Sequence, residues 1–247
     1  MRILAVNVQA GGINAKIDAL LERALGHEAD IYVLSEFRDS PIGVHIRETL
    51  EQSGYPRQTY SRGHRGNGVL VAAREIFEPV HNPAGLPEDG YPNAMIECVL
   101  ADMHVIGVYL PGQDRKRPHL DYLIRLTQAM DEQNIPAVIV GDFNSGRNET
   151  DIEANLGKKR LVDEFSTAEQ YRLLEQQWHE AWLYKHPGEV EFSWYPRTGP
   201  PLRKNGWRLD KAFVSRALLP RVRDVFYDHG FRLEGLTDHS ALIVDLD

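Results

Sequence analysis

Polar side chains with catalytic potential end or directly follow several short apolar runs of the sequence. They are Asn7, Glu36, Tyr109, Asp142, Asn144, Asp210, Asp238 and His239. A strand that crosses the core presents its last side chain at the rim of a sheet, where a ligand can reach it. A single Asp or Asn in such a place is more often a turn former, because its side chain hydrogen-bonds the local backbone. A whole set of complementary chemistry favours a functional site instead.

Three of these residues offer hard oxygen ligands for a divalent cation. Glu36 supplies a carboxylate, and Asn7 and Asp238 supply further oxygens. A donor set of oxygens without thiolates suits Mg²⁺, with Mn²⁺ as a substitute, rather than zinc. We therefore expect Mg²⁺ as the cofactor.

The remaining residues of the set suit work on a phosphoester. Asp142 and Asn144 are two apart on an extended segment and point to the same side, so one could handle the attacking water while the other donates to a phosphoryl oxygen. The Tyr109 hydroxyl is a further donor. His239 could reach the substrate while the Asp210 carboxylate orients its imidazole. The set predicts metal-assisted phosphoester hydrolysis, with either Asp142 or His239 as the general base.

Short apolar runs predict the strands that would carry these residues. Strands are expected over 2–8, 31–34, 68–73, 77–81, 94–100, 103–109, 137–140, 209–215, 222–227 and 241–245, with a further one near Phe192. Amphipathic spacing predicts helices over 13–25, 44–53 and 168–177, and another around 120–127 that ends before Pro136. This alternation favours an α/β protein with two packed sheets flanked by helices. No Pro/Gly/Ser-rich linker divides the chain, so residues 1–247 are expected to form a single domain.

Composition and charge exclude several classes of protein. The 247 residues carry a net charge of −8, which argues against a polycationic nucleic-acid coat. It does not exclude a nuclease, because a site of carboxylates around a cation is itself acidic. Cys98 is the only cysteine, so a disulfide framework is excluded and a reducing, cytoplasmic location is expected. No apolar stretch approaches the ~18 residues that span a bilayer, so we expect no membrane partner. Nothing indicates an obligate protein partner, and we expect a monomer.

Basic residues are unevenly placed along the chain. Residues 197–223 contain eight Lys and Arg against a single acid, and residues 115–117 are all basic. One such cluster is most simply a solvated loop, whereas several on one rim would form a phosphate-binding footprint. The run from Trp194 to Arg197, next to Arg203 and Lys204, is the best candidate for DNA contact because it combines stacking and charge.

Taken together, the motifs resemble those of the endonuclease/exonuclease/phosphatase superfamily. In family order they are Asn7, Ser35-Glu36, Tyr109, Gly141-Asp142-Phe143-Asn144, Arg208-Leu209-Asp210 and Thr237-Asp238-His239. The C-terminal half is most similar to exonuclease III. The resemblance implies a four-layer α/β sandwich, with two mixed sheets between helices, and divalent-metal cleavage of phosphoesters. The proline that usually follows this last motif is replaced by Ala241, which indicates a divergent branch.

The resemblance also implies a role for each residue of the set. The three oxygen-donor residues named above would bind the metal, with Glu36 as the main ligand. Asp142 would activate or orient the water, and Asn144 and Tyr109 would stabilise the pentacoordinate phosphorane. Asp210 would orient the imidazole that acts as acid/base or as a charged donor.

Substrate contacts follow from the same resemblance. Phe192 and Trp194 lie on the family's strand that helps form the pocket for an abasic sugar, and Trp207 belongs to the next matching motif. Asn67, just ahead of the predicted strand 68–73, could point into the site.

These features predict a divalent-metal-dependent phosphodiesterase that acts on DNA. The expected activity is that of an abasic-site endonuclease, a 3′–5′ exonuclease or a 3′-end processing enzyme in DNA repair. One alternative is an enzyme of the same fold that acts on inositol phosphates, phospholipids or RNA. Such phosphatases typically carry Pro-Ala-Trp-Xaa-Asp-Arg, where this chain has Gly206-Trp207-Arg208-Leu209-Asp210-Lys211. Another alternative is a non-catalytic binding domain, which is disfavoured because every polar position of the set is filled.

Overall fold

Two six-stranded β-sheets form the centre of the computed structural model, which describes residues 1–61, 66–153, 165–196 and 205–247. The first sheet has the strand order β11-β12-β1-β2-β4-β3. Its strands are β1 (Arg2–Asn7), β2 (Ile31–Phe37), β3 (Arg57–Tyr60), β4 (Gly68–Ala73), β11 (Val222–Asp228) and β12 (Ala241–Leu246). Only β1 and β2 pair in parallel, at the centre of this sheet.

The second sheet repeats this arrangement with the order β5-β6-β7-β8-β10-β9. Its strands are β5 (Glu78–His81), β6 (Met95–Val99), β7 (His104–Tyr109), β8 (Ala137–Asp142), β9 (His179–Glu180) and β10 (Asp210–Val214). Its single parallel pair, β7 and β8, is again central. Both sheets are therefore mixed, as expected.

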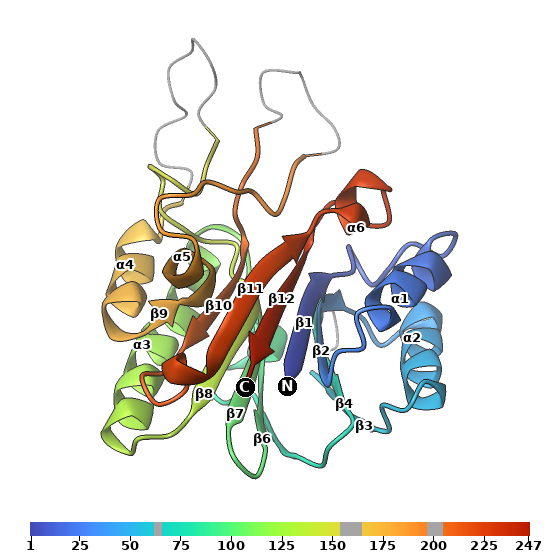
Figure 1. The fold of residues 1–247 in the computed structure, drawn as a ribbon, viewed down its shortest axis with the longest axis horizontal. Helices are drawn as coiled ribbons and strands as arrows, with labels where there is room; N and C mark the ends of the chain where they lie inside the picture. Colours follow the sequence, from blue (N-terminus) through green and yellow to red (C-terminus); the bar gives the residue numbers. More distant parts are fainter. Residues whose placement is uncertain (62–65, 154–164, 197–204) are drawn as a thin grey trace.

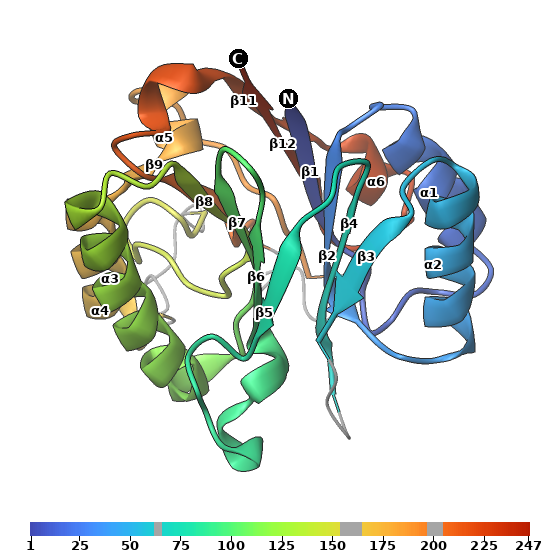
Figure 2. The same ribbon diagram turned by 90° about the horizontal axis from the view of Figure 1, so that it is seen from below.

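Helices cover the outer face of each sheet. They are α1 (Ile17–Leu25), α2 (Pro41–Gln52), α3 (Arg117–Glu132), α4 (Ala168–Gln177), and the short α5 (Ala181–Lys185) and α6 (Gly230–Leu233). Figure 2 shows the two sheets between α1 and α2 on one side and α3 and α4 on the other. Four 3₁₀ turns are described at Glu88–Gly90, Pro92–Ala94, Gln113–Lys116 and Leu219–Arg221. The predicted four-layer α/β sandwich is confirmed.

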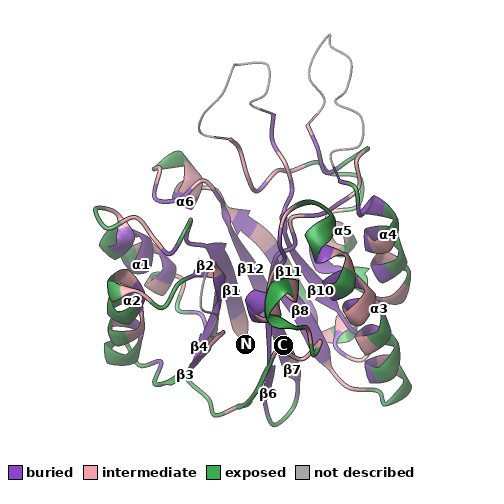
Figure 3. Ribbon diagram, turned by 180° about the vertical axis from the view of Figure 1, so that it is seen from behind, coloured by how far each residue is buried: buried purple, intermediate pink, exposed green. Residues whose placement is uncertain are grey.

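The alternation of side chains along the strands builds three cores. In β2, Val33 faces the second sheet, whereas Tyr32 and Leu34 face α1 and α2. Because consecutive strand residues point to opposite faces of the sheet, a strand that is buried on both faces has a continuous run of apolar residues in its sequence. The inner strands β4, β8, β10 and β12 are accordingly buried throughout, whereas the edge strand β5 is exposed, and many exposed residues lie on the outer helices (Figure 3). No helix in the described ranges is long and apolar enough to cross a membrane.

Some predicted element boundaries were wrong. The first helix begins at Ile17 rather than at residue 13, because the chain makes tight turns before it, with Gly11 and Gly12 at positive φ. The second helix begins earlier than predicted, at Pro41, where the Ser40 hydroxyl caps the amide of Gly43. Such a cap contributes about 1 kcal/mol.

The predicted strand near Phe192 is also wrong. The chain there is irregular and forms only isolated bridges at Trp194, to Trp207 and His239. A strand that the pattern did not predict, β3, is polar because it is an edge strand with few buried residues.

Candidate active site

The two central parallel pairs end at the same edge of the sandwich. Asn7 ends β1 opposite Ser35 of β2, and Tyr109 ends β7 opposite Asp142 of β8. The Ser35 hydroxyl joins the two sheets, since it donates to the Val108 carbonyl at 2.9 Å and accepts from the Asp142 amide at 3.3 Å. In Figure 1 these strand ends point upward, away from both termini of the chain.

The buried carboxylate of Asp142 lies in the middle of the residues at this edge of the sandwich. Asp142 Oδ2 accepts hydrogen bonds from Asn7 Nδ2 at 2.9 Å and from Asn144 Nδ2 at 3.3 Å, while Oδ1 accepts from the Asn144 amide at 2.8 Å. Asp142 is 1% exposed. Burial raises the pKa of Asp142 to about 7, with a further upward effect of the Asp210 charge and an opposing effect of His239. Asp142 is therefore poised to take up or release a proton near neutral pH.

A second pair lies directly beside this carboxylate. Asp210 is the cross-strand partner of Asp142 in the β8/β10 ladder, and its Oδ2 lies 2.8 Å from Nδ1 of His239. Burial disfavours the imidazolium, but the Asp210 charge and hydrogen bond outweigh it and raise the pKa of His239 to about 10. The Thr237 hydroxyl donates to the Asn7 carbonyl at 2.8 Å and so holds this segment against β1. At neutral pH the pair holds a charged, oriented donor.

Glu36 and Tyr109 complete the inner part of the site. Glu36 has a left-handed backbone with φ of 58°, and its carboxylate accepts from the amide of Ala10. Burial, together with the Glu36 charge, raises the pKa of Tyr109 above its usual range, so that its hydroxyl keeps its proton. Asn67 Nδ2 donates to that hydroxyl at 3.3 Å, so the Asn67 side chain lies beside Tyr109.

Aromatic side chains flank His239 on the outer side. The rings of Trp194 and His239 lie 6.4 Å apart, and Trp207 packs against Trp194 at 6.0 Å in a T-shaped pair. Phe192 is not part of this group, because its ring pairs with Tyr195 instead. The predicted DNA-contact residues Arg197, Arg203 and Lys204 lie outside the described residues.

Sequence and structure comparisons agree with this geometry. A model of the Endonuclease/Exonuclease/phosphatase family matches residues 4–239. The chain belongs to this family. Its members hydrolyse phosphoesters, and the chain is accordingly a phosphoester hydrolase. No curated protein sequence matches the chain.

Three solved structures share the fold of this family member. The NExo 3′ phosphatase from Neisseria, bound to a product DNA hairpin, superposes with a TM-score of 0.80 at 20% identity and covers 100% of this chain and 99% of its own. An AP endonuclease from Archaeoglobus fulgidus gives 0.80 at 22%, with 100% and 99% covered. The NExo 3′–5′ exonuclease from Neisseria meningitidis gives 0.78 at 22%, with 100% of both chains covered.

The donors for a metal ion form a small oxygen set. Glu36 supplies a carboxylate and Asn7 an amide oxygen, and the Asn7 side-chain NH₂ donates to Asp142 beside them. Asp238, also predicted as a ligand, accepts from the indole of Trp194 at 3.0 Å through Oδ2, one of its two carboxylate oxygens. No group of three or more His, Cys, Asp or Glu placed to hold a metal occurs within the described ranges. Mg²⁺ keeps several waters and needs only one or two carboxylates, so the oxygen donors present fit it.

Two supporting residues were missed by the sequence reasoning. Lys116, in the basic cluster 115–117 interpreted as solvated, is 2% exposed and its ammonium donates to the carbonyl of Asn144 at 2.5 Å. Burial lowers the pKa of Lys116 to about 8. Arg38 holds the Asn67 amide oxygen at 2.6 Å. Neither residue ends an apolar run or belongs to one of the family motifs, and these were the two signals for the site.

Gly141 is required for the path of the backbone into Asp142. Its φ is +138°, and a Cβ there would lie 2.2 Å from the Val108 carbonyl. We expect Gly141→Ala to lower the free energy of unfolding by at least about 2 kcal/mol, as measured in urea, because strained backbone and a clash add. Gly54→Ala is the control, since Gly54 has φ of +96° in open space and exposes only the backbone cost. An equal loss of unfolding free energy in both variants would show that the Cβ contact with the Val108 carbonyl adds nothing to the backbone cost.

Proposed function

We propose that this chain is a divalent-metal-dependent phosphodiesterase that acts on DNA, at abasic sites or at 3′ ends. The observation that carries the proposal is the Asp210–His239 pair, at 2.8 Å, beside the buried Asp142–Asn7–Asn144 cluster. An oriented cationic donor next to a carboxylate with a pKa near 7 supplies the acid and base that phosphoester hydrolysis needs. The similar solved structures, a DNA 3′ phosphatase, an exonuclease and an AP endonuclease, support DNA as the substrate.

The two pKa values favour one division of roles between the candidate bases. His239, with a pKa of about 10, is already protonated at neutral pH and is suited to donate to a phosphate oxygen. Asp142, with a pKa of about 7, is suited to orient the water and accept its proton. Asn144 and the protonated Tyr109 are placed as further donors for the charge that develops on the phosphoryl oxygens.

Glu36 and Asn7, with Asp238 as the third predicted ligand, are the residues that would hold the proposed Mg²⁺, or Mn²⁺ in its place. A bound divalent cation stabilises negative charge on the phosphoryl group. Asp142 and Asp210 are two buried carboxylates close together. The side chains that donate to Asp142 are neutral amides, and among the described residues His239 is the one cationic side chain that donates to Asp210. A further cation beside this pair is therefore favoured.

Glu36→Gln is expected to raise the Mg²⁺ concentration at half-maximal activity by at least about 10–100-fold, a loss seen even for residues that only support ligands. The variant keeps an oxygen that can accept from Ala10, so the local backbone is retained. A Mg²⁺ titration of the cleavage rate measures the effect. Glu48→Gln, an exposed change on α2, is the matched control. An unchanged titration in Glu36→Gln would show that Glu36 does not bind the metal.

The aromatic surface beside His239 supports an abasic or unpaired substrate. Trp194 and Trp207 offer ring faces and edges on which an unstacked base or a bare sugar can pack. We further propose that the protein acts as a monomer, in the cytoplasm as predicted from its single cysteine.

A substrate panel tests the proposed function. Purified protein with Mg²⁺ is incubated with abasic duplex DNA, duplex DNA with a 3′ phosphate, intact duplex, single-stranded DNA, RNA and inositol phosphates. We expect cleavage of the abasic site or release of the 3′ phosphate to be fastest. Preferred turnover of inositol phosphates or RNA would replace DNA by that substrate, and no turnover of any of them would overturn the proposal.

A further inference from the structure

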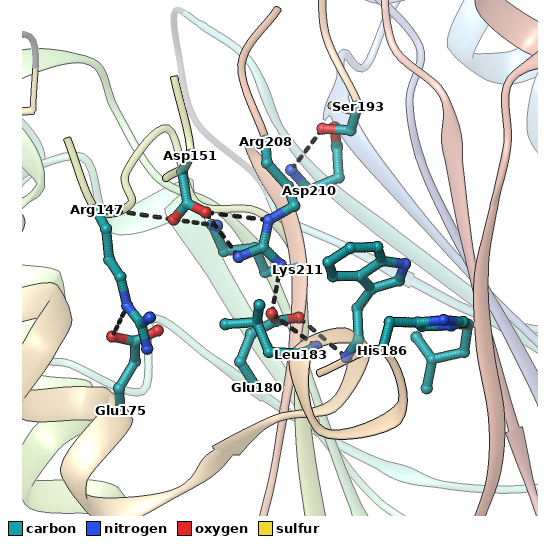
Figure 4. Close-up of polar contacts among 12 residues, drawn as sticks. Arg147, Asp151, Glu175, Glu180, Leu183, His186, Ser193, Arg208, Asp210 and Lys211 are labelled. Atoms are coloured by element: carbon teal, nitrogen blue, oxygen red, sulfur yellow. Dashed lines mark hydrogen bonds and ion pairs between the residues drawn. The ribbon is translucent and has the colours of Figure 1, made fainter. Parts of the chain in front are cut away.

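Four buried charged side chains form a cluster at the segment that carries Asp210, and none of them belongs to the catalytic set. They are Asp151, Glu180, Arg208 and Lys211, and we refer to them as the Asp151 cluster (Figure 4). Each side chain is at most 2% exposed. The basic run 197–223 is therefore not purely a surface footprint, because two of its cations are in the core.

The contacts within the Asp151 cluster are nearly saturated. Arg208 donates to Asp151 Oδ1 through Nε at 3.1 Å and Nη2 at 2.7 Å, and its Nη1 donates to Glu180. Lys211 Nζ and the amide of Arg147 donate to Asp151 Oδ2 at 3.0 and 2.8 Å. Although burial opposes ionisation, Lys211 and Arg208 hold the pKa of Asp151 at about 2. The cluster thus pairs two carboxyl side chains with two basic ones; burial and the neighbouring Arg208 lower the pKa of Lys211, and Asp151 and Glu180 oppose that shift.

The same cluster joins two of the segments that carry candidate catalytic residues. Asp151 lies in the loop that follows β8 and Asn144, and its carbonyl accepts from the Arg208 amide at 2.9 Å. Arg208 and Lys211 flank Asp210 in the chain. From the opposite side, the Ser193 hydroxyl accepts from the amides of Leu209 and Asp210 at 3.0 and 3.1 Å. The backbone of Asp210 is therefore fixed on both sides.

Stability alone is a poor reason for such a cluster. Burying paired charges costs desolvation energy, and apolar residues of similar size are often as stable or more stable. A buried ionic cluster does, however, restrict the geometry of the segments that it joins. A displacement of about 1 Å in a catalytic group can cost on the order of 100-fold in rate, so restriction at this place matters for activity.

We propose that Asp151 is a positioning residue which, through Arg208 and Lys211, fixes the backbone of Asp210 and thereby the orientation of the His239 imidazole. The proposal rests on the proposed function for its effect on turnover. Its structural part, the coupling of Asp151 to the Asp210–His239 hydrogen bond, concerns the free protein.

The central variant removes one anion and one cation together. Asp151→Asn alone leaves two buried cations facing one anion and is expected to be unstable. In Asp151→Asn with Lys211→Met the buried charges balance again, so the protein is expected to fold. Asp245→Asn is the control, because Asp245 is a buried carboxylate paired with Arg2 at the other end of β1.

Two readouts are measured on each folded variant. One is the nuclear magnetic resonance signal of the His239 Nδ1 proton in protein labelled with ¹⁵N-histidine. The other is kcat and KM on the preferred substrate. We expect the double variant to shift or broaden the His239 signal and to lose about 10–100-fold in kcat at unchanged KM, whereas Asp245→Asn lowers the melting temperature and changes neither readout.

Two other outcomes would contradict the positioning role of Asp151 or the proposed function. If the double variant keeps the wild-type His239 signal and kcat, the Asp151 cluster only stabilises the fold and the proposal is wrong. If the wild-type protein cleaves no phosphoester, the proposed function fails, while the His239 signal still decides whether Asp151 positions Asp210.

Discussion

His239→Ala is expected to lower kcat on the preferred phosphoester substrate by about 10²–10⁴-fold, the usual contribution of a positioned acid or base. The imidazole is hydrogen-bonded to Asp210 at 2.8 Å and is protonated at neutral pH, so the variant loses a charged, oriented donor. Single-turnover rates at saturating Mg²⁺ measure the loss. His104→Ala is the control, because His104 pairs with Glu97 at the start of β7, opposite the end that carries Tyr109.

The pairing of His239 with Asp210 makes a second, sharper expectation. Because the carboxylate acts chiefly through the imidazole, adding Asp210→Asn to His239→Ala should cost much less than the product of the two single losses. The double variant also has no buried, unpaired carboxylate at this place, which keeps folding comparable. Losses that multiply in full would show that the two residues act independently. Near-native activity in His239→Ala would exclude the catalytic role itself.

The position of the catalytic set could be predicted from the sequence because each member ends or follows an apolar run. Asn7, Tyr109 and Asp142 are the last residues of their strands, and strand topology alone brings those ends together. The pattern of apolar runs that end in a polar residue was therefore sufficient to predict most of the site. Each sheet has a parallel strand pair at its centre, so this pattern occurs twice along the chain.

Buried charge could not be predicted in the same way. Arg208 and Lys211 stand in a basic run, and their partner Asp151 is 57 and 60 residues away in sequence. The burial of Lys116 depends likewise on a carbonyl 28 residues away. Whether a charged side chain is buried depends on residues far away in the sequence, whereas a basic run shows only how many charges lie close together along the chain. The segment around Phe192 was mispredicted as a strand because it forms only isolated bridges, from Trp194 to Trp207 and His239, and no continuous ladder with a neighbouring strand.

The buried carboxylate of Asp142 gives the other large effect, and it links stability to activity. Its pKa rises from 3.8 to about 7 because burial, and the Asp210 charge beside it, disfavour the ionised form. A carboxyl group whose pKa is higher in the folded state favours folding when it is protonated. As the pH rises through 3.8 the unfolded chain ionises first, so the folded state loses stability until the folded group has also ionised near pH 7.

Asp142→Asn is therefore expected to reduce activity by about 10²–10⁴-fold and at the same time to remove this pH-dependent loss of stability. The substituted side chain does not ionise, and its amide oxygen can still accept from the amide of Asn144. In urea unfolding with a chelator present, the stability of the variant relative to the wild type should rise by on the order of 3 kcal/mol between about pH 4 and pH 8. Added Mg²⁺ should narrow that gap by stabilising the wild-type carboxylate. A stability difference that does not change with pH would show that Asp142 is ionised at no cost in the folded protein, and the assignment of the water-activating role to this residue would lose its physical basis.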